Sequence, residues 1–216
     1  MFRKSSQIWL SADQHFEHKN ILRYCARPFN SLEDMARGLM APYREMIHPF
    51  DTVYWLGDLV FMRKTIPGYV KPVGRTALVR GNHDKIDAGD YRRAGILKVH
   101  NSLEIDHGGE RIFLIHNPMQ VLLDEAQKRK ISVRGLTWDN PIIRKLAENL
   151  PYKVFCAHVH QLFRRFGQFV NVGVDVWDYR PITLEEALDA FSKPSALSDE
   201  TQHRREIPCE EVPSKK

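Results

Sequence analysis

Short apolar segments that end abruptly in Asp or His constrain this chain more than any other feature of its sequence. Residues 8–12 lead into Asp13 and His15, and residues 52–56 lead into a glycine and Asp58. Apolar runs of this length, rich in β-branched and aromatic residues, are typical of buried strands. Polar side chains that follow a buried strand lie at the edge of a sheet, where α/β proteins carry their functional groups.

The same pattern recurs three more times along the chain. Strands predicted at 76–79, 111–115 and 154–157 are followed by further polar residues: Asn82, His83, Asp84, His116, His158 and His160. Each cluster taken alone has an ordinary explanation, such as a turn residue or a hydrogen-bonded core histidine. Such explanations do not account for five clusters that all follow predicted strands in one chain. We therefore expect the five clusters to converge on one site.

Amphipathic segments lie between the predicted strands. Residues 32–47 are predicted to form a helix, because Ser31 can cap its start and apolar residues recur on one face. Pro42 is expected to break or kink this helix. Two glycines between 102–105 and 111–115 predict a hairpin. Other helices are predicted at 19–26, 124–130, 141–150 and 183–191, and other strands at 162–166 and 168–172. This alternation indicates a layered α/β fold.

Composition places the chain among soluble globular proteins. Hydrophobic residues make up 43% and charged residues 27% of the 216 residues, and no run approaches the roughly 20 apolar residues of a membrane helix. We expect one domain over residues 1–191 and a mobile tail over 192–216, which is rich in Pro, Ser, Glu and Lys. Three dispersed cysteines and the lack of a signal-peptide pattern favour a cytoplasmic location: Cys25, Cys156 and Cys209.

The charge of the chain suits an acidic partner. Its formal net charge is +5 and its isoelectric point is about 9.1. A phosphate-ester substrate is the expected partner, with nucleic acid among the candidates, and no membrane partner is expected. The sequence leaves the oligomeric state open.

The residue types in the five clusters point to divalent metal ions. Carboxylate oxygens and imidazole nitrogens hold hard and borderline divalent cations without thiolate. The i, i+2 spacing of Asp13 and His15, and of His158 and His160, places each pair on one face of a strand. Seven of these nine side chains are taken as candidate ligands and are listed below; this number suits two ions better than one, and two ions about 3.5–4 Å apart can clamp a phosphoryl group. A structural zinc module is disfavoured because none of the five clusters contains a cysteine.

The ordered series Asp-x-His, Gly-Asp, Gly-Asn-His-Asp, His and His-x-His resembles the signature of the calcineurin-like metallophosphoesterase superfamily, over residues 8–182. Within it, residues 13–29, 51–58 and 171–181 are similar to a branch of small bacterial and phage phosphoesterases. The resemblance implies a layered β-sandwich flanked by helices in four layers, α/β/β/α, and a hydrolase with a binuclear metal centre. One departure is Ala157, which stands where the family usually has glycine. We expect this change to be tolerated.

The resemblance also implies a role for each residue. His83 would stabilise charge on the phosphate or protonate the leaving oxygen, and Asp84 would orient His83. The two ions are expected to be manganese, with iron and zinc as alternatives. Their implied ligands are Asp13, His15 and His160 on the first ion, Asn82, His116 and His158 on the second, and Asp58 bridging both.

Residues beside the clusters offer two further hypotheses. His18 and Arg27 are predicted to contact a substrate phosphate, Arg27 through a bidentate contact; the alternative is that they brace the helix at 19–26. Four aromatic residues could form a stacking platform for bases, although core packing and lid formation are the simpler explanations: Trp138, Phe163, Trp177 and Tyr179.

The function that these expectations favour is hydrolysis of phosphate esters by a hydroxide activated between two metals. A compact chain without a large cap domain, together with the basic charge, favours phosphodiesters, including nucleic acid or nucleotides. One alternative is a phosphomonoesterase that acts on a small metabolite, a nucleotide or a phosphoprotein. The other is a non-catalytic scaffold with the same fold, which the complete set of seven ligand candidates argues against.

Overall fold

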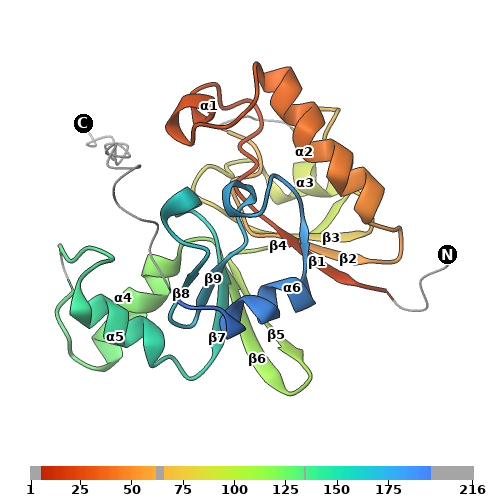
Figure 1. Ribbon diagram of the computed structural model, residues 1–216. Coiled ribbons are helices and arrows are strands. Elements are labelled where there is room, and N and C mark those ends of the chain that lie inside the picture. The colour runs from red at the N-terminus through yellow and green to blue at the C-terminus, as the bar shows by residue number, and fades with distance from the viewer. Residues whose placement is uncertain (1–5, 62–65, 134, 196–216) are drawn as a thin grey trace.

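The order and direction of the strands decide where the polar clusters meet. The computed structural model describes residues 6–61, 66–133 and 135–195, and its strands form two five-stranded sheets (Figure 1). The first sheet contains β1 (Ile8–Ser11), β2 (Thr52–Trp55), β3 (Arg75–Val79), β4 (Ile96–His100) and β10 (Ile182–Thr183). Its order is β10-β1-β2-β3-β4, with β1 to β4 parallel and β10 antiparallel to β1. The carboxyl ends of β1, β2 and β3 therefore lie at one edge.

The second sheet brings the other clusters to that edge. It contains β5 (Ser102–His107), β6 (Glu110–Ile115), β7 (Lys153–Cys156), β8 (Arg165–Phe166) and β9 (Phe169–Asn171). Its order is β5-β6-β7-β9-β8; β6, β7 and β9 are parallel, and β5 and β8 are antiparallel to their neighbours. The ends of β6 and β7 lead into His116 and His158. Two mixed sheets thus place five strand ends together.

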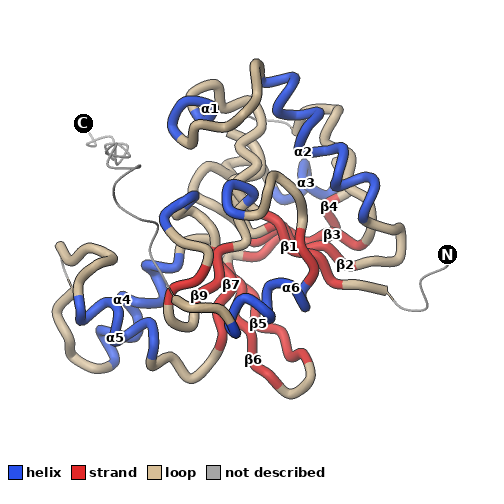
Figure 2. The backbone as a smooth tube through the Cα atoms, viewed as in Figure 1, coloured by secondary structure: helices blue, strands red, loops and turns tan. Residues whose placement is uncertain are grey.

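Helices pack against the two sheets (Figures 1 and 2). They are α1 (Ile21–Tyr24), α2 (Leu32–Met46), α3 (Ala88–Arg93), α4 (Pro118–Lys128), α5 (Pro141–Glu148) and α6 (Leu184–Asp189), with 3-10 turns at η1 (His160–Leu162), η2 (Val174–Val176) and η3 (Ala190–Ser192). None of the helices in the described ranges is long and apolar enough to cross a membrane.

Three groups of buried apolar side chains hold these layers together. The group between the two sheets includes residues from both of them: Leu10, Leu56, Val79, Leu114 and Phe155. A second group joins α2 and α3 to the first sheet, and a third joins α4 and α5 to the second sheet. Burial of apolar surface between layers is the main stabilising contribution in such a fold. The expected α/β/β/α arrangement is confirmed.

Local structure differs from the sequence-based expectations at a few places. The break expected at Pro42 is wrong, since α2 continues through it. Proline removes one backbone donor, but Met35, Leu39 and Tyr43 are buried and hold the helix on both sides of it. The strand predicted at 162–166 forms only at its end, as the two-residue β8, while Leu162 belongs to the turn η1 and residues 163–164 are irregular. Residues 196–216 lie outside the described residues, so the division into a domain and a tail stays a prediction.

Candidate metal centre

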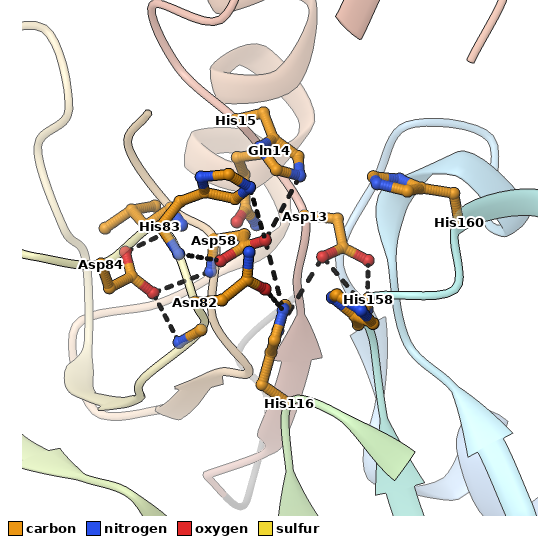
Figure 3. A network of polar contacts seen from close by, with 12 residues as sticks. Asp13, Gln14, His15, Asp58, Asn82, His83, Asp84, His116, His158 and His160 are labelled. Atoms are coloured by element: carbon orange, nitrogen blue, oxygen red, sulfur yellow. Dashed lines mark hydrogen bonds and ion pairs between the residues drawn. The ribbon is translucent and has the colours of Figure 1, made fainter. Parts of the chain in front are cut away.

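Loops that leave the ends of the strands bring the candidate ligands together (Figure 3). The carboxylate of Asp58 lies at the centre. Its Oδ2 is 3.2 Å from Nε2 of His116 and 3.5 Å from Nε2 of His15. One group of potential donor atoms comprises His15, Asp58 and His83, and another comprises Asp58, His116 and His158; within each group the atoms lie within 4.8 Å of one another. Asp58 belongs to both groups.

The remaining ligand candidates border these two groups. Asn82 Oδ1 is 3.2 Å from Nε2 of His116, and the ring centroids of His15 and His160 are 5.2 Å apart. The Asp13 carboxylate accepts the backbone N–H of His158 at 3.0 Å. All seven predicted ligands therefore line one site, and their assignment to particular ions stays a prediction.

The backbone at these positions is unusual for residues with side chains. Asp13, His15, Asp58, His158 and His160 have φ angles of 57°, 51°, 51°, 72° and 44°. The left-handed region costs non-glycine residues roughly 1–3 kcal/mol each in strained cases, and such residues cluster at functional sites. The surrounding sheets hold these loops in conformations that turn the ligand side chains toward one another.

Two glycines allow the loops to approach closely. A Cβ atom on Gly81 would lie 2.1 Å from Oδ1 of Asp58, and one on Gly57 would lie 2.5 Å from Nδ1 of His116. Neither distance is compatible with a real side chain. The glycines of the Gly-Asp and Gly-Asn-His-Asp motifs are thus required by packing around the shared carboxylate.

Burial and charge shift the protonation of the site strongly. Burial works against a charged His116 ring, yet the charge and hydrogen bond of Asp58, together with Asp13 and the Leu56 carbonyl, outweigh it and raise the pKa of His116 to about 9. Burial raises the pKa of Asp13 to about 6, although His160 and His116 oppose this effect. Burial also lowers the pKa of His158 to about 4. Perturbed acids and imidazoles packed in this way are typical of functional sites.

The side chains fit a divalent cation. Both ring nitrogens of His15 are buried and make no hydrogen bond to any residue that the structure describes. A buried polar atom without a partner is costly, and a bound cation would satisfy it. Carboxylate, imidazole and amide donors without thiolate suit manganese, iron or zinc. The coarse expectation of a buried His/Asp metal site is thus supported by the geometry.

His83 and Asp84 occupy different surroundings. The His83 side chain is 15% exposed, and its Nε2 lies 4.0 Å from Oδ2 of Asp58. The Asp84 carboxylate instead accepts four hydrogen bonds, from the backbone N–H groups of Asp58, Leu59 and Gly81 and from the Tyr91 hydroxyl. Among the described residues it makes no hydrogen bond to the His83 ring. The role predicted for Asp84 is corrected accordingly: it holds the two loops through their backbone.

The prediction that Arg27 contacts substrate is wrong. Its side chain is fully buried and forms a bidentate ion pair with Asp175, at 2.7 and 2.9 Å. A guanidinium engaged in this way has no free edge for a phosphate. His18 is also buried and stacks on Phe61 with ring centroids 3.7 Å apart, and its substrate contact stays a prediction.

Two of the four aromatic residues considered for a stacking platform are buried in the core. Phe163 is 1% exposed and Trp177 is 6% exposed. The ring of Trp138 packs edge-on against Phe163 and Phe166. Core packing is thus correct for Phe163 and Trp177, whereas Trp138 and Tyr179 are half-buried beside the apolar groups.

Sequence reasoning missed Asp175 and the closeness of a cysteine. Asp175 Oδ2 is 2.8 Å from Nδ1 of His160, and Cys25 lies in the same group of potential donors. These residues are far apart in the sequence. The signal that could have found Asp175 is Arg27, because a buried arginine requires an acidic partner.

Comparisons with known proteins agree with the fold. A scan of protein-family models finds no match. The chain is 28% identical over 200 residues to the uncharacterized protein MJ1445 of Methanocaldococcus jannaschii, which covers 87% of this chain and 92% of that protein. The crystal structure of AQ665 from Aquifex aeolicus, a protein of unknown function, superposes with a TM-score of 0.62 at 23% identity, over 87% of this chain and all of that one.

A second solved structure is similar at a lower level. A conserved uncharacterized protein from Streptococcus pneumoniae, a predicted phosphoesterase, has a TM-score of 0.36 at 15% identity, over 79% of this chain and 73% of that one. The fold class is thus shown by the two sheets described above and by the similarity to AQ665.

Proposed function

We propose that this chain, which has the layered fold of calcineurin-like metallophosphoesterases, hydrolyses phosphate esters with the help of two divalent metal ions. One observation carries the proposal. The buried carboxylate of Asp58 lies between two groups of imidazoles, with His15 on one side and His116 and His158 on the other. A carboxylate shared in this way is the arrangement that two neighbouring cations need.

Different side chains would bind the cations, contact the phosphoryl group and hold the loops in position. Bound cations would stabilise phosphoryl oxygens and activate a water nucleophile. The seven ligand candidates would hold these cations in a rigid, buried frame. His83 is partly exposed and lies beside Asp58. From there it would stabilise charge on the phosphoryl group or donate a proton to the leaving oxygen. Asp84 would keep the loops of Asp58 and His83 in register through its backbone hydrogen bonds.

Phosphodiesters are the proposed substrates, with nucleotides or nucleic acid among them. The net charge of +5 favours acidic substrates in general. The residues that the structure describes include no large cap domain over the site, which would leave room for the second ester group. A phosphomonoesterase and a non-catalytic scaffold are the competing proposals. Manganese is the first metal to test, followed by iron and zinc.

The test uses purified protein, Mn²⁺ and two chromogenic esters of the same leaving group. We expect turnover of the bis(p-nitrophenyl) ester to exceed that of the p-nitrophenyl monoester, followed by activity on oligonucleotides. The reverse order would reject the diester preference and favour the phosphomonoesterase.

Metal binding is measured separately from turnover. A ligand that binds only the folded state stabilises it by about 2.7 kcal/mol at a concentration 100 times its Kd. We therefore expect Mn²⁺ to raise the melting temperature of metal-free protein. Bound metal without turnover of either ester supports the scaffold, and the lack of any metal binding rejects the proposed function altogether.

A further inference from the structure

A buried ion pair lies directly behind one of the proposed metal ligands. Nε and Nη2 of Arg27 donate to the two carboxylate oxygens of Asp175, at 2.7 and 2.9 Å. Both side chains are fully shielded from solvent. A buried pair of this kind contributes little net stability compared with apolar residues of the same size. Its presence therefore calls for another explanation.

The carboxylate of this pair orients the imidazole of His160. Asp175 Oδ2 is 2.8 Å from Nδ1 of His160, so this nitrogen donates its hydrogen and Nε2 is left for a cation. The backbone of His160 is held by another residue, because Nδ2 of Asn171 donates to the carbonyl of His160 at 2.6 Å. The orientation of His160 thus depends on residues that are not ligands.

The guanidinium of the pair also holds the first ligand loop. Nη2 of Arg27 donates to the carbonyl of Asp13 at 2.6 Å, and Nη1 donates to the carbonyl of Gln14 at 2.9 Å. One cation therefore ties the backbone of the Asp13–His15 loop to the carboxylate that holds His160. Residues separated by about two thirds of the chain become one rigid unit.

A separate cation site at this position is a less satisfactory explanation. Cys25, His160 and Asp175 have potential donor atoms within 4.8 Å of one another. Both oxygens of Asp175 are already occupied, one by Arg27 alone and the other by Arg27 and His160. The adjacent guanidinium would also repel a second cation. These contacts describe a hydrogen-bonded chain.

We propose that Arg27 and Asp175 are positioning residues, which fix the orientation of His160 and its loop relative to Asp13 and so set the affinity of the first metal. The part that concerns metal affinity rests on the proposed function, whereas the part that concerns the orientation of His160 does not. Outer partners of this kind commonly change metal affinity by about 10- to 100-fold.

The first test is a calorimetric titration of metal-free protein with Mn²⁺. Removing only Asp175 would leave Arg27 as a buried unpaired charge and endanger folding. The informative variant is therefore the double substitution Arg27→Met with Asp175→Leu, which removes both charges and keeps similar volumes. We expect the affinity of one binding event to fall by about 10- to 100-fold and the other to stay within about twofold of the wild type. Equal affinities in wild type and variant would overturn the proposal.

A matched control separates positioning from a general loss of stability. Asp51 is also a buried carboxylate, and it accepts hydrogen bonds from the Trp9 indole and from the backbone of Gln7 and His48. It lies at the opposite end of β2 from Asp58. Asp51→Asn should lower the melting temperature and leave both Mn²⁺ affinities unchanged. A drop in Mn²⁺ affinity in Asp51→Asn equal to that of the double variant would overturn the proposal.

A second test does not depend on metal. Imidazole ¹⁵N–¹H correlation spectra of the metal-free protein, with His160→Gln used for assignment, should show a protected Nδ1–H on His160. This signal should be lost in the double variant. Free exchange at Nδ1 in the wild type would overturn the positioning role even where Mn²⁺ binds. A protected Nδ1–H in a protein that binds no Mn²⁺ supports the positioning role and rejects only the proposed function.

Discussion

The two halves of the candidate site hold their imidazoles in different ways. In the half that contains His160, Nδ1 donates to a side-chain carboxylate, Asp175, which is itself held by Arg27. In the half that contains His116, Nδ1 donates to the backbone carbonyl of Leu56 at 2.7 Å. Both arrangements fix the hydrogen on Nδ1 and leave Nε2 for a cation. The group that accepts from Nδ1 lies 15 positions from His160 in the first case and 60 positions from His116 in the second.

This difference affects how each half can change. The Leu56 carbonyl comes with the end of β2, and no substitution removes it. The Asp175 carboxylate depends on two side chains, and either can be lost by a single mutation. We therefore infer that the His116 half is the fixed part of the site and the His160 half is the part whose affinity can be tuned. The three predictions below test that division.

The largest effect is expected from Asp58→Ala, because both halves share this carboxylate. The variant loses the group that lies 3.2 Å from His116 and 3.5 Å from His15. We expect both metals to be lost together and diesterase turnover to fall by at least about 10³-fold, equivalent to roughly 4 kcal/mol of transition-state stabilisation. Metal content by plasma mass spectrometry and turnover of the bis-ester measure the two effects.

Asp51→Ala is the matched control for this prediction. Asp51 and Asp58 flank the same strand, and each is 2% exposed. The control should lose stability and keep its metals. Retention of one full equivalent of metal in Asp58→Ala would mean that the halves do not share a ligand, and the comparison between them would have to be redrawn as two independent sites.

An intermediate effect is expected from His83→Ala. His83 and His15 both lie near Asp58, and their ring centroids are 5.4 Å apart. If His83 acts on the substrate, both metals stay bound and kcat falls by about 10²- to 10⁴-fold. Replacement of the exposed His48 by alanine controls for the loss of a histidine elsewhere. Selective loss of metal from the His15 side in His83→Ala would instead make His83 a ligand of that half.

Much of this comparison could be predicted from the sequence. The strands before Asp13, Asp58 and His116 are short apolar runs, and parallel packing of such runs brings their ends together. The hairpin between β5 and β6 could also be predicted, because two consecutive glycines between apolar runs favour a tight turn. In the structure both glycines adopt the positive φ angles that such a turn requires. Local patterns such as apolar runs and a Gly-Gly turn were therefore sufficient to predict most of the strands and the positions of the clusters.

Contacts between distant segments could not be predicted in the same way. Arg27 and Asp175 are 148 positions apart, and nothing local distinguishes an arginine that binds phosphate from one that holds a buried carboxylate. The edge strand β4 was missed because its burial does not alternate and Leu97 is exposed. Asp84 was assigned to His83 by its position in the motif, whereas its four hydrogen bonds depend on the approach of another loop.

The smallest effect is expected from Tyr91→Phe, which tests how rigidly the fixed half is supported. The Tyr91 hydroxyl donates to Oδ1 of Asp84 at 3.1 Å, and the side chain is fully buried. Phenylalanine keeps the packing and removes one of four donors to this carboxylate. We expect a loss of about 1 kcal/mol in unfolding free energy, a decrease of about 2–4 °C in melting temperature, and unchanged affinity for both metals. The three backbone donors from Asp58, Leu59 and Gly81 remain and keep the loops in place. Calorimetric titration and thermal melts of the same samples measure both quantities. A selective decrease in the second metal's affinity would show that the His116 half also depends on a removable side chain, and the distinction between a fixed and a tunable half would then fail.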